Sequence, residues 1–255
     1  MKRLVHLTDI HYPYCIGAFH DITKPERETP IFKFLKDFQP HIIVEGGDQM
    51  DLGVIAHWNK GKPRLKEGQR LKKEYQGFSK VLDKFDRLKS LERHVMLEGN
   101  HDNWINMLVD EHPEFEGMLE VQENLDLRGR GIEWIPSRQH FKLGSAYFIH
   151  GDYKDGYMPV YAAKAIAGIY GKSVFYGHQH TNQVYAAQTP FDQEPFQVTG
   201  VGCLCALNPS WKRNSPAAWL NSFMVMHLDE KTGNYYHQVI NIIDGKFVYD
   251  GQIYK

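Results

Sequence analysis

Excess charge of one sign, long apolar runs and paired cysteines are all missing from this chain. Its 30 Lys and Arg residues balance 31 Asp and Glu residues, so net charge supplies no long-range attraction for a polyanion. No apolar stretch approaches the roughly 18 residues that a membrane crossing needs, and the opening MKRLVHLTD lacks the apolar centre of a signal peptide. We therefore expect a cytoplasmic protein with no membrane association.

Cysteine is rare, with only Cys15, Cys203 and Cys205 in the chain. Three thiols are too few and too unevenly placed for a disulfide framework, and one would stay unpaired, so reduced thiols are expected. The CxC spacing of Cys203 and Cys205 could be half of a zinc site. Because no second thiol pair exists, buried strand residues are the favoured reading.

Linkers and internal repeats are absent as well. A chain of 255 residues with 42% apolar residues can bury one sizeable core, and no Pro-, Gly- or Ser-rich stretch divides it. We therefore predict a single domain over residues 1–255.

What the chain does contain is one pattern used five times, a short β-prone apolar run that ends in Gly, Asp, Asn or His. The five copies are LVHLTDIH, HIIVEGGD, HVMLEGNHD, AYFIHGD and SVFYGHQH. Between them, apolar residues at spacings of three and four predict helices over 30–38, 71–88 and 157–171. Near the end of the chain, residues 222–228 and 234–242 flank a turn and predict a hairpin. Strands alternating with helices predict an α/β fold with polar residues gathered at the strand ends.

Oxygen and nitrogen donors dominate these strand ends, with no cysteine among them. Such donors suit divalent ions such as manganese, iron or zinc. Seven candidates are more than one tetrahedral ion can use, so two divalent ions sharing a carboxylate are expected, with Mn²⁺ favoured and Fe, Zn or Ni left open. The candidate ligands are Asp9, His11, Asp48, Asn100, His150, His178 and His180.

Five motifs in a fixed order connect these residues to a known family. They are DIH at 9–11, GGDQMD at 46–51, GNHD at 99–102, HGD at 150–152 and GHQH at 177–180. The set resembles the calcineurin-like metallophosphoesterase superfamily, whose pattern is DxH, GDxxD, GNH(D/E), a lone His and GHxH. The resemblance implies an α/β fold built as a two-layer β-sandwich flanked by helices, with a dinuclear metal site at the strand ends.

The same resemblance assigns roles to individual residues. It implies that one ion is held by Asp9, His11 and His180, the other by Asn100, His150 and His178, and that Asp48 bridges the two. His101 matches the catalytic histidine, and Asp51 matches the carboxylate that pairs with it. Two ions about 4 Å apart bind a phosphate and make a bridging hydroxide available near neutral pH. Protonated His101 would serve the leaving oxygen as general acid, with Asp51 keeping the ring oriented and cationic.

Departures from the family pattern narrow the substrate. Protein phosphatases of this superfamily continue the second motif as DRG and end the third in Glu, whereas here Leu52 and Gly53 follow Asp51, and Asp102 ends the third motif. This favours a phosphodiesterase or nuclease-like enzyme acting on a phosphoester, nucleotide or nucleic acid, although Arg138 could replace the missing arginine. The alternatives are a phosphomonoesterase or protein phosphatase, a nucleic-acid-binding module with incidental hydrolysis, and a non-catalytic binding scaffold. Retention of His101 disfavours the scaffold, and the oligomeric state stays open.

One cationic stretch, the basic segment, comprises residues 60–73 and holds seven cationic side chains and one Glu. Its Gly and Pro residues predict an exposed loop before the long helix. It could be the solvent-exposed start of the long helix. Alternatively, it could be a flap that binds phosphates of an oligonucleotide, with Trp58 as a surface on which a base stacks. Cys15 and His20 follow the first motif closely enough to approach the same site.

Overall fold

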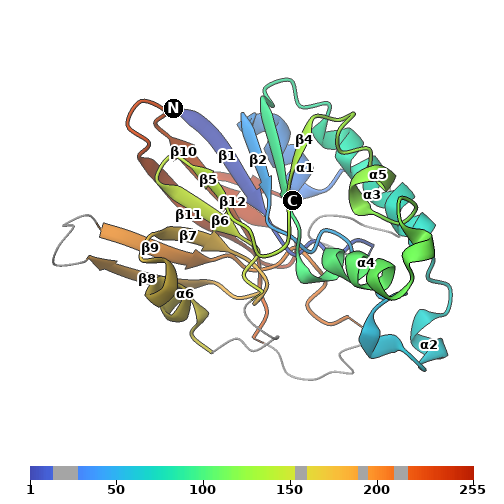
Figure 1. The fold of residues 1–255 in the computed structure, drawn as a ribbon. Coiled ribbons are helices and arrows are strands. Elements are labelled where there is room, and N and C mark those ends of the chain that lie inside the picture. The colour runs from blue at the N-terminus through green and yellow to red at the C-terminus, as the bar shows by residue number, and fades with distance from the viewer. Residues whose placement is uncertain (14–27, 153–159, 189–194, 210–217) are drawn as a thin grey trace.

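The described residues form two large β-sheets with helices on their outer faces, together with one two-stranded sheet (Figure 1). The computed structural model describes residues 1–13, 28–152, 160–188, 195–209 and 218–255. The first sheet has the order β11-β10-β1-β2-β3-β4, with bounds β1 (Lys2–Leu7), β2 (Ile42–Glu45), β3 (Arg93–Leu97), β4 (Ile132–Ile135), β10 (Asn221–Leu228) and β11 (Tyr235–Ile242). The second has the order β5-β6-β7-β9-β8, with bounds β5 (Phe141–Leu143), β6 (Ala146–Ile149), β7 (Ser173–Tyr176), β8 (Gln183–Gln188) and β9 (Pro195–Gly200).

Strand direction brings the polar strand ends together. β1, β2, β3 and β4 are parallel neighbours, and β6, β7 and β9 are parallel in the second sheet. The five polar-ended runs of the sequence form β1, β2, β3, β6 and β7, which confirms those strands. The predicted hairpin is also confirmed, because β10 and β11 pair antiparallel.

The two sheets pack face to face through an apolar layer. Leu4, Val44 and Leu97 of the first sheet meet Phe148 and Phe175 of the second. These side chains are at most 1% exposed, and full burial of each contributes about 1.5–3 kcal/mol. This layer confirms the expected sandwich of two sheets.

Helices cover the outer face of each sheet. An apolar cluster on the first sheet includes residues from α1 (Pro30–Phe38), α3 (Leu71–Phe85), α4 (Asn100–Glu111) and α5 (Val121–Asn124), whereas α6 (Ala162–Tyr170) packs on the second sheet. The remaining elements are short: η1 (His57–Asn59), α2 (Pro63–Lys66), η2 (Pro113–Phe115), and the pair β12 (Phe247–Tyr249) and β13 (Gln252–Tyr254). None of the described helices combines the length and apolar character needed to span a bilayer.

The helix predictions hold with shifted ends. The helix over 30–38 is confirmed as α1. The helix predicted over 71–88 is α3, which ends at Phe85. Leu88 lies in the following turn but is still buried in the core, so the apolar pattern extends beyond the helix. Of the helix expected over 157–171, residues 157–159 lie outside the described residues, and α6 starts at Ala162. It stops where Gly171 takes the left-handed conformation that ends many helices.

Candidate metal centre

The loops after the parallel strands are tied to one another by main-chain hydrogen bonds. The Asp9 N–H donates to Gly47 O at 3.0 Å, and the His11 N–H donates to Asp48 O at 3.0 Å. From the second sheet, the His178 N–H donates to Asp9 Oδ2 at 2.9 Å. Segments far apart in sequence thereby meet at the carboxyl ends of the strands.

Asp9, His11 and His180 form the first group of donors. His180 Nε2 lies 3.1 Å from Asp9 Oδ1 and 3.3 Å from His11 Nε2. His11 Nε2 is 3.9 Å from the same Asp9 oxygen. The three atoms thus face one small volume, while their role as ligands of one ion stays a prediction.

Asn100, His150 and His178 form the second group. His150 Nε2 lies 3.1 Å from Asn100 Oδ1, and the rings of His150 and His178 are 5.1 Å apart between centroids. The Nδ1 of His150 lies 2.9 Å from the carbonyl oxygen of Gly46. An Nδ1–H that donates to this carbonyl leaves the lone pair on Nε2, the arrangement typical of a histidine that ligates a metal.

Asp48 lies between the two groups. Its Oδ2 is 3.8 Å from His11 Nε2 and 3.4 Å from His150 Nε2. Two sets of side chains with metal-sized spacing share it, one with His11 and His101 and the other with His150 and His178. A third set of that size joins His11, His180 and Cys205. Several His, Asp and Cys groups could therefore hold metal ions.

The buried carboxylates make the site favourable for cations. Burial disfavours the charged forms of Asp9 and Asp48, but neighbouring histidines outweigh it and hold both pKa values below the usual range. Burial likewise opposes charge on His150 and His180, yet Asp48 and Asp9 raise the pKa of these two imidazoles to about 10. A divalent ion that binds here would displace such protons.

Left-handed backbone is concentrated at the candidate ligands. Five of the seven have φ values between 48° and 63°: Asp9, His11, Asp48, His178 and His180. This conformation costs roughly 1 kcal/mol or more per residue, although Asp, Asn and His adopt it more readily than most. Strain of this kind gathers at functional sites, where the surrounding structure enforces it.

The motif glycines allow the loops to approach closely. A Cβ added to Gly99 would lie 2.2 Å from Asp48 Oδ1, and one added to Gly47, whose φ is 98°, would lie 2.4 Å from His150 Nδ1. Neither position accepts a side chain without moving a candidate ligand.

His101 lies in the first turn of α4, but its partner differs from the predicted one. Its Nδ1 is 2.7 Å from the main-chain carbonyl of Asp51, and its ring stacks on Trp104. The Asp51 carboxylate instead lies 3.6 Å from His11 Nδ1, and the next residue, Leu52, has a left-handed φ of 49°. The expectation of a carboxylate–His101 pair is thus corrected. Burial also lowers the pKa of His101, and the nearby Asp48 and Asp51 offset this only in part.

Sequence reasoning missed two contacts of the site. Asp102 is fully buried and accepts hydrogen bonds from the N–H groups of Asp48 and Gly99 at 2.9 and 3.0 Å. The signal was available, since an acid three residues after a helix N-cap often turns back onto the cap. Cys205 Sγ lies 3.8 Å from His180 Nδ1, and no local pattern pointed to this contact.

Other predicted residues fall around the centre. Cys203 and Cys205 are buried as expected, but both follow β9 and lie outside the strands. Arg138 lines a 240 Å³ pocket together with His150, and its Nε is 3.9 Å from Asp152 Oδ2. Cys15 and His20 lie outside the described residues.

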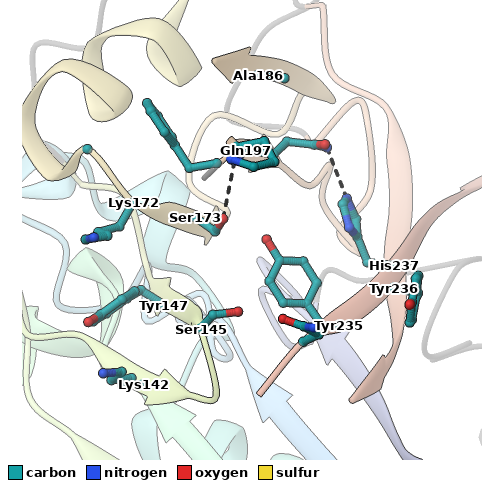
Figure 2. A pocket seen from close by; sticks show the side chains of 14 residues that line it. Lys142, Ser145, Tyr147, Lys172, Ser173, Ala186, Gln197, Tyr235, Tyr236 and His237 are labelled. Atoms are coloured by element: carbon teal, nitrogen blue, oxygen red, sulfur yellow. Dashed lines mark hydrogen bonds between the residues drawn. The ribbon is translucent and has the colours of Figure 1, made fainter. Parts of the chain in front are cut away.

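A larger pocket, of 1010 Å³, lies away from all these residues (Figure 2). Ser145, Ser173 and Pro195 on its wall stand at the starts of the parallel strands β6, β7 and β9, so it occupies the opposite end of the sheets. Among the residues that the structure describes, its lining includes Lys142 and Lys172 but no Asp or Glu.

Comparison with known proteins gives little. No protein-family model matches the chain, and no curated protein matches it. Among solved structures, a similar chain is the Vps29 of Chaetomium thermophilum, with 11% sequence identity, a TM-score of 0.44, and coverage of 94% of this chain and 97% of that chain. A likeness of this degree decides nothing about activity, so the function has to be inferred from the site itself.

Proposed function

We propose that this protein is a metal-dependent phosphoesterase, a phosphodiesterase or nuclease-like enzyme with a centre of two divalent ions. The position of Asp48 supports this best, because its buried carboxylate lies between two groups of oxygen and nitrogen donors. That donor chemistry fits Mn²⁺, with Fe, Zn or Ni as alternatives. When bound, such ions supply Lewis acidity and a water of lowered pKa.

The chain itself supplies the proton transfer. The Asp51 carbonyl fixes Nδ1–H of His101, so Nε2 is the nitrogen that can carry a second proton and give it to a leaving oxygen. Nε2 lies 3.9 Å from Asp48 Oδ2, which places it beside the shared carboxylate. A lowered pKa makes this proton easier to donate, while reducing the fraction of molecules that carry it.

The choice of a diester follows from the cations near the centre. Leu52 is buried where the related phosphatases carry an arginine. Among the described residues, Arg138 offers one cationic contact beside His150, and its side chain is 67% exposed. A monoester dianion requires more such contacts than a diester monoanion, so we infer a preference for diesters.

A metal panel on two chromogenic substrates tests the proposal. The protein is stripped with a chelator, reloaded with Mn²⁺, Fe²⁺, Zn²⁺ or Ni²⁺, and assayed with bis-p-nitrophenyl phosphate and p-nitrophenyl phosphate. We expect turnover only after metal addition, with the diester preferred. Metal binding without turnover of either compound would support a binding scaffold, and a preference for the monoester would support the phosphatase alternative.

A further inference from the structure

The basic segment is a local reversal of the charge of the chain. Residues 60–73 hold seven cationic side chains and one acid, whereas the rest of the chain holds 23 cationic and 30 acidic residues. Such a contrast concentrates positive potential on one small surface. Figure 1 shows α2, which lies within the segment, at the periphery of the molecule.

The cations of the segment have no acidic partner among the residues that the structure describes. Six of the seven are exposed, and Lys66 is half-buried. None forms an ion pair with any residue that the structure describes. Arg130, which follows α5, by contrast pairs with both Asp83 and Asp86. These charges are therefore available to neutralise phosphates of a ligand.

Contacts with the site loop fix the start of the segment. The Asn59 side-chain amide donates to Gly53 O at 2.8 Å. A Cβ on Gly53 would lie 2.7 Å from Asp51 Oδ2 and 3.2 Å from Gln69 Oε1, so Gln69 packs next to the residue whose carbonyl contacts His101. The segment thus begins directly beside the candidate centre.

Helix α3 fixes the other end of the segment to the same loops. Glu74, in its first turn, accepts the Leu52 N–H at 2.9 Å. One turn later, a Cβ on Gly77 would overlap the ring of Tyr12, the residue that follows His11. Both ends of the segment therefore rest on loops that carry candidate site residues.

Trp58 adds a second kind of contact. Its side chain is 67% exposed, immediately before the segment, and the His57 ring meets it edge-on at 5.8 Å. An exposed indole offers a face on which an unpaired base can stack. A nucleic acid strand supplies both bases and a run of phosphates, whereas a small diester supplies one phosphate only.

From these observations we infer that the basic segment and Trp58 bind single-stranded nucleic acid and lead it to the candidate metal centre. The inference rests on the proposed function for the catalytic step. A single strand is favoured over a duplex because stacking on Trp58 needs an unpaired base. The cations give contacts without base preference, so sequence-independent binding is expected.

Charge reversal tests the binding directly. The variant Lys62→Glu/Arg64→Glu/Lys66→Glu is compared with wild type by fluorescence anisotropy of a labelled 15-nucleotide strand, with chelator present so that no hydrolysis occurs. We expect Kd to rise about tenfold or more at low salt. The slope of log Kd against log salt should decrease by about 2, because three phosphate contacts are lost and each contributes about 0.7 to the slope for a single strand. Trp58→Ala should weaken binding at all salt concentrations, and Trp58→Phe should weaken it less.

The control reverses three cations at the other end of the molecule, with Lys142→Glu/Lys172→Glu/Lys231→Glu. Two of these line the pocket of Figure 2, so the control also tests the competing cationic surface. Equal loss of affinity in both triple variants, or a larger loss in the control, would overturn the inference. Retained circular dichroism and melting temperature in both variants show that each is folded.

A kinetic comparison separates this inference from the proposed function. Metal-loaded wild type should cleave the strand and bis-p-nitrophenyl phosphate, and charge reversal in the segment should raise KM for the strand alone. Absence of any turnover with intact, salt-dependent binding would refute the phosphoesterase and leave a binding surface. If both substrates are turned over and charge reversal leaves KM for the strand unchanged, the binding role of the segment is refuted and the phosphoesterase activity stands.

Discussion

The two ends of the parallel strands differ in charge and in backbone conformation. At the carboxyl ends, buried Asp9 and Asp48 lie among histidines, and left-handed residues gather. At the amino ends, the pocket of Figure 2 is larger, but its lining has no acid in the part of the chain that the structure describes. Its two serine hydroxyls already have partners, since Ser145 donates to Gly233 O and Ser173 accepts the Gln197 N–H. Buried charge and backbone strain, rather than volume, distinguish a candidate centre.

The largest effect is expected from Asp48→Asn. Losing the shared negative charge should disturb both ions and lower diester turnover by about a thousandfold or more, since such ions supply several kcal/mol of stabilisation. Elemental analysis of metal content and steady-state kinetics measure the change. The matched variant Lys172→Glu, at the other end of β7, should leave both unchanged. A comparable loss in that variant would remove the distinction between the two ends.

His101→Ala should lower turnover about a hundredfold while metal content stays near wild type, because loss of a general acid has roughly that effect. The defect should be greater for a diester with an alkyl leaving group than for one that releases p-nitrophenolate, which needs little protonation. His112→Ala, at the other end of the same helix, serves as control. Full activity of His101→Ala on the alkyl diester would refute the acid role.

Asp102→Ala should both loosen the fold and weaken the metal site. The N–H groups of Asp48 and Gly99 would lose their acceptor, which should lower the free energy of unfolding by about 2 kcal/mol. Metal affinity should fall roughly 10- to 100-fold, as for other residues that support ligands. Urea denaturation and metal titration measure the two effects. Asp102→Asn keeps one acceptor oxygen, so a loss as large as that of Ala would contradict this explanation.

The smallest effect concerns pH. Burial, with a contribution from Asp51, raises the pKa of Glu74 to about 8, and its Oε1 is buried without a hydrogen-bond partner among the described residues. Between pH 4.5 and 8 the folded protein keeps a proton that the unfolded chain has lost, so the free energy of unfolding falls as pH rises. Glu74→Gln should remove most of this fall over that range. Denaturation at several pH values measures it, and an unchanged slope would exclude Glu74 as its source.

Local patterns were sufficient for much of the fold. The strands before Asp48, Asn100 and His178 could be predicted because each is a short apolar run cut off by Gly and polar residues, a signal contained within about eight residues. The structure brings the candidate ligands together at the sheet ends, while their role as ligands stays a prediction. Helix α4 was harder to recognise, because only Asp102 and Ile105 of its residues are buried and its apolar stripe is weak.

Contacts set by tertiary packing could not be predicted from local patterns. The carbonyl of Asp51 contacts His101 while its carboxylate lies near His11, and no spacing in the sequence records that choice. The approach of Cys205 to His180 joins residues that follow different strands of the second sheet. The alternating exposure of β8 was also missed, since a six-residue strand with one half-buried face gives a faint pattern.

The left-handed backbone of the ligand loops has a consequence for how this site can vary. At Asp9, Asp48 and His180 a replacement must be tolerated by the backbone before its donor atom matters, and Asp, Asn, His and Gly are the residues that qualify most easily. Threonine or valine would be rejected even where no ion is bound. Substitutions at these positions would therefore alternate between oxygen donors, imidazole and no side chain at all, so the conformation of the loop restricts the donor atoms that descendants of this protein can place here.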